Sequence, residues 1–494
     1  MVALSSMQHL SASIESEEET DVVVVGGGTA GWAAAYASAG RGSRTTLVES
    51  LPFLGGTMTG AMVLGSAGFR HQSIATEDQE ISYEGDPVVR GVAQEFLNRL
   101  IGLGGAWGKQ DSPTVKLNFD HELTKVVMEE MMTDAGVDIW FNAQFVDVVM
   151  DGNRVAGVLV STNGGLNVIW AKVVVDCSGD GAVAHRAGAP FEVGRASDGR
   201  PQASSLYFLV GGVDIQGVLN YFKENPDELR RESSTSKSTP EVLEQRLKAG
   251  MPLMFQGFKR AHHKAIENGD FPVALGAQGP VFQLGPFRTI WRGGRADPYI
   301  TAHNMDTSFG IMPTNRKELA QAIMASRKFI LGMVAFYRKY IPGYENCYLL
   351  LSAPMFGIRE SRRITGDYIL TEADAMEGRE FMDAVGRCGA YVDIHDEDGG
   401  TRPTDLREVG GEKGWFHIPY RALLPKDVEG LLTAGRCISA DHIAQASVRQ
   451  QSVCMTTGHA AGAAAALAAQ EGTTPRDLDV EVLQTALRNQ EAII

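Results

Sequence analysis

The chain has 494 residues, of which 44% are hydrophobic and 21% charged, an ordinary composition for a globular protein of two or three domains. Sixty acidic residues against 45 basic ones give a net charge of −15, so we expect neither nucleic acid nor a membrane as partner. The five cysteines lie far apart without a C-x-x-C pair, which excludes a local zinc or iron–sulfur ligand set and is typical of a reduced, cytoplasmic protein.

The first twenty residues carry no basic segment followed by an apolar one, and they end in the acidic run Glu15–Thr20. We therefore expect residues 1–20 to be a disordered leader. No apolar run reaches the roughly 18 residues needed to cross a bilayer.

A strand, a glycine turn, a helix and a second strand then follow in order. Asp21–Val25 is a β-branched apolar run typical of a strand buried on both faces, and it leads into GGGTAG at Gly26–Gly31. Trp32–Ala39 has the small residues of a closely packed helix, and the strand Thr45–Val48 ends at Glu49. This is the βαβ unit of a dinucleotide-binding fold.

The remaining elements complete an α/β architecture. Residues 137–175 alternate in polarity and contain two turn sequences, which predicts an antiparallel meander attached to the parallel sheet. We expect a Rossmann-type domain from residues 21–194 and 416–475, an α+β substrate or cap domain at 195–415, and a helical tail at 476–494. The other predicted elements are helices at 88–100, 122–132, 317–340 and 447–469 and a buried strand at 430–434.

The glycine turn predicts where a dinucleotide binds. Gly26 permits the tight turn, Gly28 leaves room for a pyrophosphate at the helix start formed with Thr29 and Ala30, and Gly31 lets the helix approach the strand. Glu49 is placed to accept hydrogen bonds from the adenosine ribose.

Three further glycine clusters favour FAD over NAD. They are Gly55-Gly56-Thr57, Gly179-Asp180 and Gly435-Arg436, from both ends of the chain. NAD needs one such unit, whereas an extended FAD molecule contacts an N-terminal motif together with a C-terminal strand and helix. The alternative, that each cluster is an ordinary loop, is acceptable singly and poor for all three together.

The chain resembles the FAD-dependent oxidoreductase family, flavoproteins with a glutathione-reductase type of FAD-binding fold. The resemblance covers most of the chain, with residues 200–350 the poorest part. The blocks that carry it are Gly26–Gly31, Phe53–Thr57, Val173–Pro190 (VVVDCSGDGAVAHRAGAP), Gly357–Thr371 (GIRESRRITGDYILT) and Ile418–Gly462. It implies fold and cofactor and leaves the substrate open.

Two related classes match less well. Gly26–Trp32 (GGGTAGW) and Asp176–Gly179 also resemble flavin-dependent halogenases, but the W-x-W-x-I-P motif of those enzymes is replaced here by Gly414–Pro419 (GWFHIP). Pyridine-nucleotide-disulfide reductases have a second glycine motif and a redox cysteine pair, and this sequence has neither.

These patterns predict an enzyme that oxidises a small organic substrate by hydride transfer to flavin N5, a dehydrogenase or oxidase whose flavin is reoxidised by oxygen or another acceptor. Two alternatives stay open. One is a flavin monooxygenase or halogenase-like enzyme supplied with external reducing equivalents, and the other is a non-catalytic FAD-binding redox sensor. The oligomeric state is also open.

Hydride removal needs a base for the heteroatom proton and a cation for the developing charge. We expect His442 as the first candidate base, with His417 and His395 behind it. The candidate cations are Arg449, expected in the first turn of the alanine-rich helix, together with Arg359 and Arg436. The charged run 359–363 is interpreted as a solvated strand face from which one arginine turns toward the active site.

Overall fold

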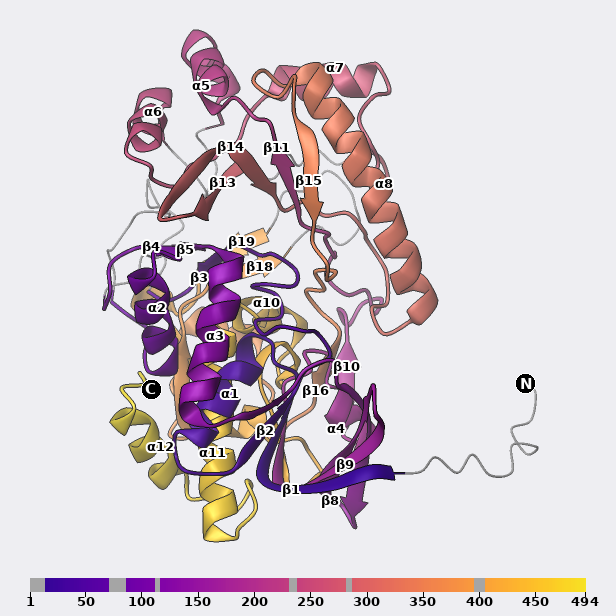
Figure 1. Ribbon diagram of the computed structural model, residues 1–494, viewed down its shortest axis with the longest axis vertical. Coiled ribbons are helices and arrows are strands. Elements are labelled where there is room, and N and C mark those ends of the chain that lie inside the picture. The colour runs from indigo at the N-terminus through magenta and orange to yellow at the C-terminus, as the bar shows by residue number, and fades with distance from the viewer. Residues whose placement is uncertain (1–13, 71–85, 112–115, 231–237, 281–286, 395–404) are drawn as a thin grey trace, which may run out of the picture.

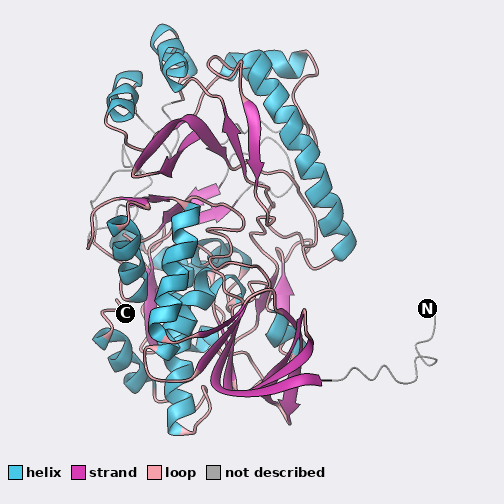
Figure 2. Ribbon diagram, viewed as in Figure 1, coloured by secondary structure: helices cyan, strands magenta, loops and turns pink. Residues whose placement is uncertain are grey.

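A computed structural model describes residues 14–70, 86–111, 116–230, 238–280, 287–394 and 405–494 (Figure 1). Two layered domains share the long axis of the molecule, one around a mostly parallel sheet and one around an antiparallel sheet (Figure 2).

The larger sheet has the strand order β6-β2-β1-β9-β8-β7, and β21 also pairs with β9. Its parallel strands are β1 (Ile14–Val25), β2 (Thr45–Val48), β6 (Asp138–Trp140), β9 (Gly165–Asp176) and β21 (Leu431–Thr433). β7 (Gln144–Asp151) and β8 (Arg154–Thr162) join β9 as the predicted antiparallel meander. The valines of β1 are buried because helices and neighbouring segments cover the sheet.

The expected disordered leader is wrong for residues 14–20. β1 begins at Ile14, and its first half pairs with β9 in parallel, with Glu17 opposite Val168. The acidic side chains there are largely exposed, so backbone pairing with β9 holds a segment whose composition predicted disorder. Residues 1–13 lie outside the described residues.

Two helices of small residues pack closely over the sheet. α1 (Thr29–Ala39) and α11 (Gln451–Glu471) are buried almost all round. A side chain at Gly458 would lie 2.1 Å from the Ala30 carbonyl oxygen, and one at Gly462 the same distance from that of Ala34. Glycine at these two positions therefore sets the spacing of the helices. The other helices of this domain are α2 (Val92–Gly102), α3 (His121–Ala135), α4 (Ala182–Arg186), α9 (Glu372–Glu377), α10 (His442–Val448) and α12 (Val480–Asn489).

The second domain, called the cap, has an antiparallel sheet in the order β12-β13-β14-β11-β15. An aromatic core lies beneath it, with Phe208, Phe287 and Tyr337 around His303. Its elements are β11 (Phe208–Gly211), β12 (Met254–Phe255), β13 (Phe287–Arg292), β14 (Arg295–His303), β15 (Tyr348–Ser352), α5 (Ile215–Glu224), α6 (Pro240–Lys248), α7 (Lys259–Glu267) and α8 (Arg316–Tyr340).

The cap sheet ends at Ser352, well before the expected domain boundary at residue 415. The following strands pack against α9 to α12 instead, so the chain returns to the first domain about 60 residues earlier than expected. The small sheets of the first domain pair β10 (Phe191–Val193) with β16 (Arg362–Ile364), β17 (Ala384–Cys388) with β20 (Phe416–Pro419), β18 (Val392–Ile394) with β19 (Asp405–Arg407), and β5 (Lys116–Phe119) with β3 (Gly65–Ala67) and β4 (Ala106–Trp107).

Candidate functional site

The glycine turn after β1 brings the predicted nucleotide motif against the second glycine cluster. Gly28 and Gly55 form a parallel bridge, and the Gly55 N–H donates to the Gly27 carbonyl at 2.9 Å. The Thr29 and Thr57 hydroxyls lie 3.3 Å apart. A side chain at Gly31 would lie 1.7 Å from the Gly26 carbonyl oxygen, so the turn can close only around glycine there.

The two remaining clusters meet the same turn. Gly26 lies against Cys177, just before Gly179, since a Cβ at Gly26 would be 2.6 Å from the Cys177 carbonyl oxygen. A Cβ at Gly435 would be 2.9 Å from that of Ala30. All four glycine segments predicted from the sequence therefore converge at one edge of the sheet.

Glu49 lies at the end of β2, where its carboxylate receives backbone hydrogen bonds. One oxygen accepts from the Gly27 N–H and the other from the Leu51 N–H, both at 2.7 Å. Burial raises the pKa of Glu49, and these amide hydrogen bonds act in the opposite direction. A carboxylate has further lone pairs, so ribose binding stays a prediction for this residue.

Asp180 and Arg436 are joined directly. Asp180 Oδ1 accepts from Arg436 Nη2 at 2.8 Å and from the Ser361 hydroxyl at 2.6 Å. Ser361 was not among the predicted residues. Asp180 belongs to the third glycine segment, Arg436 to the fourth and Ser361 to the segment that returns from the cap. Their hydrogen bonds therefore connect these three segments.

The described residues fit a bound flavin dinucleotide. No side chain caps the start of α1 at Gly28, its first turn has no acidic residue, and a Cβ at Gly28 would have nothing nearer than 3.8 Å. An uncapped helix start with open space before it favours an anionic pyrophosphate. Near the start of α11, the buried atoms Arg449 Nε and Gln451 Oε1 have no hydrogen-bond partner among the described residues, so they are available to a ligand.

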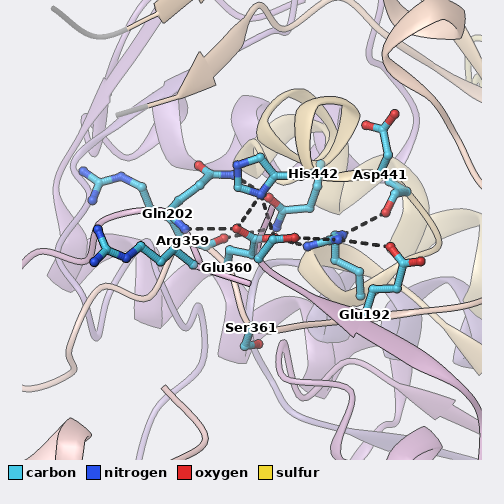
Figure 3. Close-up of polar contacts among 12 residues, drawn as sticks. Glu192, Gln202, Arg359, Glu360, Ser361, Asp441 and His442 are labelled. Atoms are coloured by element: carbon cyan, nitrogen blue, oxygen red, sulfur yellow. Dashed lines mark hydrogen bonds and ion pairs between the residues drawn. The ribbon is translucent and has the colours of Figure 1, made fainter. Parts of the chain in front are cut away.

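A buried pair of a carboxylate and an imidazole lies where the chain passes between the domains (Figure 3). His442 is the first residue of α10, and its Nδ1 lies 3.0 and 2.9 Å from the two carboxylate oxygens of Glu360. The Glu360 side chain is fully buried, and that of His442 is 9% exposed. This pairing gives the leading histidine candidate a fixed orientation.

Further groups hold Glu360 in place. Arg363 Nη1 contacts its Oε1, and the Gln202 N–H donates to its Oε2 at 3.0 Å. Arg363 also donates to the carbonyls of Ala440 and Gly194, both at 3.0 Å. The expected solvated strand face at 359–363 is therefore wrong: Arg359, Glu360 and Arg363 are buried because partners from three distant segments satisfy their charges.

Arg359 links the returning segment to the cap. Its Nη1 donates to the Ala203 carbonyl at 2.6 Å, and its Nη2 lies 3.0 Å from an Asp306 carboxylate oxygen, with both side chains buried. Gln445 of α10 donates to the Arg359 carbonyl at 3.1 Å and accepts from Gln202 at 2.9 Å. Neither glutamine was predicted, and the sequence carries no periodic signal that marks them.

Arg449 differs from its predicted position. The predicted helix 447–469 is two helices, and Arg449 is the C-cap of α10, two residues before α11 begins. Its Nη2 donates to the Asp393 carbonyl at 2.7 Å and lies 3.5 Å from the Asp393 carboxylate. Burial lowers the pKa of Arg449.

The other histidine candidates lie outside this cluster. His417 is on β20, where its Nδ1 accepts from the Phe381 N–H at 3.2 Å and its ring stacks on Trp415. Burial lowers its pKa, with a further contribution from Arg387. His395 lies outside the described residues.

The family model described as FAD dependent oxidoreductase matches residues 21–487. The chain therefore belongs to the FAD-dependent oxidoreductase family: it is a flavoprotein oxidoreductase whose cofactor is FAD and which acts on an organic substrate.

Individual relatives are distant. A digeranylgeranylglycerophospholipid reductase of Picrophilus torridus is 26% identical over 167 residues, which are 33% of this chain and only 40% of that protein. Among solved structures, a geranylgeranyl bacteriochlorophyll reductase-like protein from Thermoplasma acidophilum is 14% identical with a TM-score of 0.43, covering 97% of this chain and 85% of that one. A myxobacterial chondrochloren halogenase is 15% identical with a TM-score of 0.40, covering 96% and 79%. Similarities at this level leave the activity open.

Proposed function

We propose that this FAD-dependent oxidoreductase oxidises a small organic molecule that carries an alcohol or an amine. The observation that carries the proposal is the buried Glu360–His442 pair at the passage between the domains. Bound FAD supplies the hydride acceptor at N5, held by the glycine turn of α1 and the clusters that converge on it. His442 is the group that takes the heteroatom proton as hydride leaves the adjacent carbon.

The pair sets which atom of His442 can act. Neutral imidazole carries one N–H, and Glu360 accepts a hydrogen bond from Nδ1, so the lone pair is left on Nε2. When Nε2 takes a proton, the Glu360 carboxylate stabilises the resulting cation. Arg363 and the Gln202 amide keep Glu360 oriented during this change.

Two arginines have separate roles in this proposal. Arg449 lies beside the start of α11, and its Nε has no hydrogen-bond partner within the described ranges, so it would stabilise negative charge on the reduced cofactor. Arg359, already engaged by Ala203 and Asp306, would keep the cap in position over the site.

A second candidate is the opposite direction of hydride transfer. The Picrophilus torridus relative is named as a reductase, which favours reduction of a substrate with external reducing equivalents. His442 would then donate a proton from Nε2 to the product. The two candidates differ in their source of electrons: this one requires an external electron donor, and the first takes electrons from its substrate.

Anaerobic stopped-flow reduction of the purified holoprotein tests the proposal. A panel of small alcohols, hydroxy acids and amines should include compounds that bleach the flavin, and His442→Asn should slow that bleaching at least about 100-fold. The matched control is His263→Asn on the exposed surface of α7, which should reduce at the wild-type rate. Rapid bleaching by NADPH with no response to the panel would support the reductase or the monooxygenase class instead. If neither the panel nor NADPH bleaches the flavin, the remaining candidate is the non-catalytic redox sensor.

A further inference from the structure

Helix α8 contains three Arg-Lys pairs with a regular spacing. The pairs are Arg316-Lys317, Arg327-Lys328 and Arg338-Lys339, each 11 residues after the one before. Eleven residues make slightly more than three complete turns, so the pairs stack along one face of the helix, about 16 Å apart. All six side chains are exposed.

Two large apolar side chains lie on the same face. Met324 is 64% exposed and Leu331 is 60% exposed. At 100° per residue both fall between the row of arginines and the row of lysines. The opposite face, with Phe329, Ile330 and Met333 among others, is buried in the cap.

This basic face is nearly free of internal partners. Lys339 pairs with Asp270 at 2.7 Å, but the other five basic residues of α8 form no ion pair with the described part of the chain. The one acid in the helix, Glu318, accepts from the Met312 N–H and from Asn315 near the helix start. The face is therefore a positive strip on a chain of net charge −15.

We propose that α8 docks the protein onto an anionic phospholipid surface, lying parallel to it. Figure 1 shows α8 along the outer flank of the cap, where a flat surface can reach its length of about 37 Å. All three Arg-Lys pairs would then meet lipid headgroups at once, while Met324 and Leu331 enter the interface between them.

The local charge prevails over the net charge in this setting. Salt limits the reach of electrostatic interactions to about 8 Å at physiological ionic strength, so a surface in contact with α8 interacts mainly with the basic strip. This differs from the expectation that the negative net charge would exclude membranes.

Other partners fit the same face less well. A protein that takes a helix into an apolar groove needs the apolar face, and the cap covers that face. A nucleic acid backbone would gain nothing from the exposed Met324 and Leu331. The helix is long and apolar enough to cross a bilayer by length and composition alone, but 39% of the relevant window is buried within the protein, which favours a surface position.

Co-sedimentation of the holoprotein with vesicles tests the proposal. The wild type should bind phosphatidylcholine vesicles containing about 30% phosphatidylserine, should not bind pure phosphatidylcholine vesicles, and should be released by about 0.5 M salt. The triple variant Arg327→Glu, Lys328→Glu, Arg338→Glu should bind at least about 10-fold more weakly. Met324→Gln with Leu331→Gln should weaken binding without removing its dependence on salt.

The matched control is Arg90→Glu, Lys426→Glu, Arg488→Glu, three exposed residues outside α8 that form no ion pair with the described part of the chain. It changes the net charge equally and should bind vesicles like the wild type. Equal loss in both triple variants would overturn the proposal, because net charge alone would then govern binding. No binding to anionic vesicles, or binding to duplex DNA or polyglutamate instead, would also overturn it. Retained FAD and an unchanged thermal midpoint establish that each variant is folded.

Discussion

Two buried polar sites, one in each domain, are satisfied in different ways. In the nucleotide-binding domain, Glu360 and Arg363 are ionic groups that lie in contact inside the protein. In the cap, His303 is equally buried but uncharged, with Nε2 2.9 Å from the Thr301 hydroxyl and Nδ1 3.1 Å from that of Tyr337. Burial lowers the pKa of His303 to about 3.

The difference distinguishes a candidate functional site, at Glu360, from a part of the protein that only supports the fold, around His303. A buried ion lowers the stability of the fold unless its charge is paired and hydrogen-bonded. We therefore expect buried ion pairs mainly where the charge has a function. A neutral histidine among aromatic rings costs little and contributes packing. The two sites should therefore respond differently to substitution and to pH.

Removing Glu360 should produce the largest effect. Glu360→Ala removes the buried carboxylate that pairs with Arg363 and leaves it only the exposed Glu192 as an ionic partner, so we expect the free energy of unfolding to fall by about 3–5 kcal/mol. Urea denaturation measures it. The control Asp147→Ala breaks the exposed pair with Arg186 and should cost less than about 1 kcal/mol. Similar losses in the two variants would mean that the buried pair is not special.

The sequence predicted the first domain better than the cap. A β-branched run followed by glycines, as at Val22–Gly28, is a local pattern, and it led to the sheet, the first helix and the convergence of the glycine clusters. The Glu360–His442 contact joins residues 82 positions apart, and no local pattern encodes such a pairing. The run at 359–363 was misinterpreted because charge density alone does not distinguish a solvated face from a satisfied interior.

Two other errors have local physical causes. The break between α10 and α11 was missed because no proline or glycine marks it, and Arg449 and Gln450 at the break are both good helix formers. The cap boundary was placed too late because the segment after Ser352 is irregular in sequence, although it packs on the first domain.

The glycine turn separates a position that the fold fills from one that it leaves open. Gly31→Ala would place Cβ 1.7 Å from the Gly26 carbonyl oxygen, so we expect a loss of about 3 kcal/mol together with loss of FAD. Gly28→Ala meets no atom nearer than 3.8 Å, so the apoprotein should lose less than about 1 kcal/mol while FAD binding still weakens at least about 10-fold. Thermal unfolding of the apoproteins and FAD titration measure the two effects. Equal destabilisation of the apoproteins would show that Gly28 is needed for folding and is not specific to the ligand.

The last prediction concerns the pH dependence of the cap, whose sign follows from the buried His303. Above about pH 6.5 the His303 imidazole is neutral in both the folded and the unfolded chain, so it adds no pH dependence. Below that pH the unfolded chain binds a proton that the folded chain refuses until about pH 3, so stability falls as pH falls through this window. The slope is about 1.4 kcal/mol per pH unit, which gives about 2 kcal/mol between pH 7 and pH 5.

His303→Asn removes the titrating group, and the other buried histidines remain in both proteins, so the difference between their pH dependences isolates His303. Urea denaturation at the two pH values should show the wild type losing about 2 kcal/mol more than His303→Asn. An equal loss would mean that His303 accepts a proton within the folded cap, so that burial does not keep this imidazole neutral.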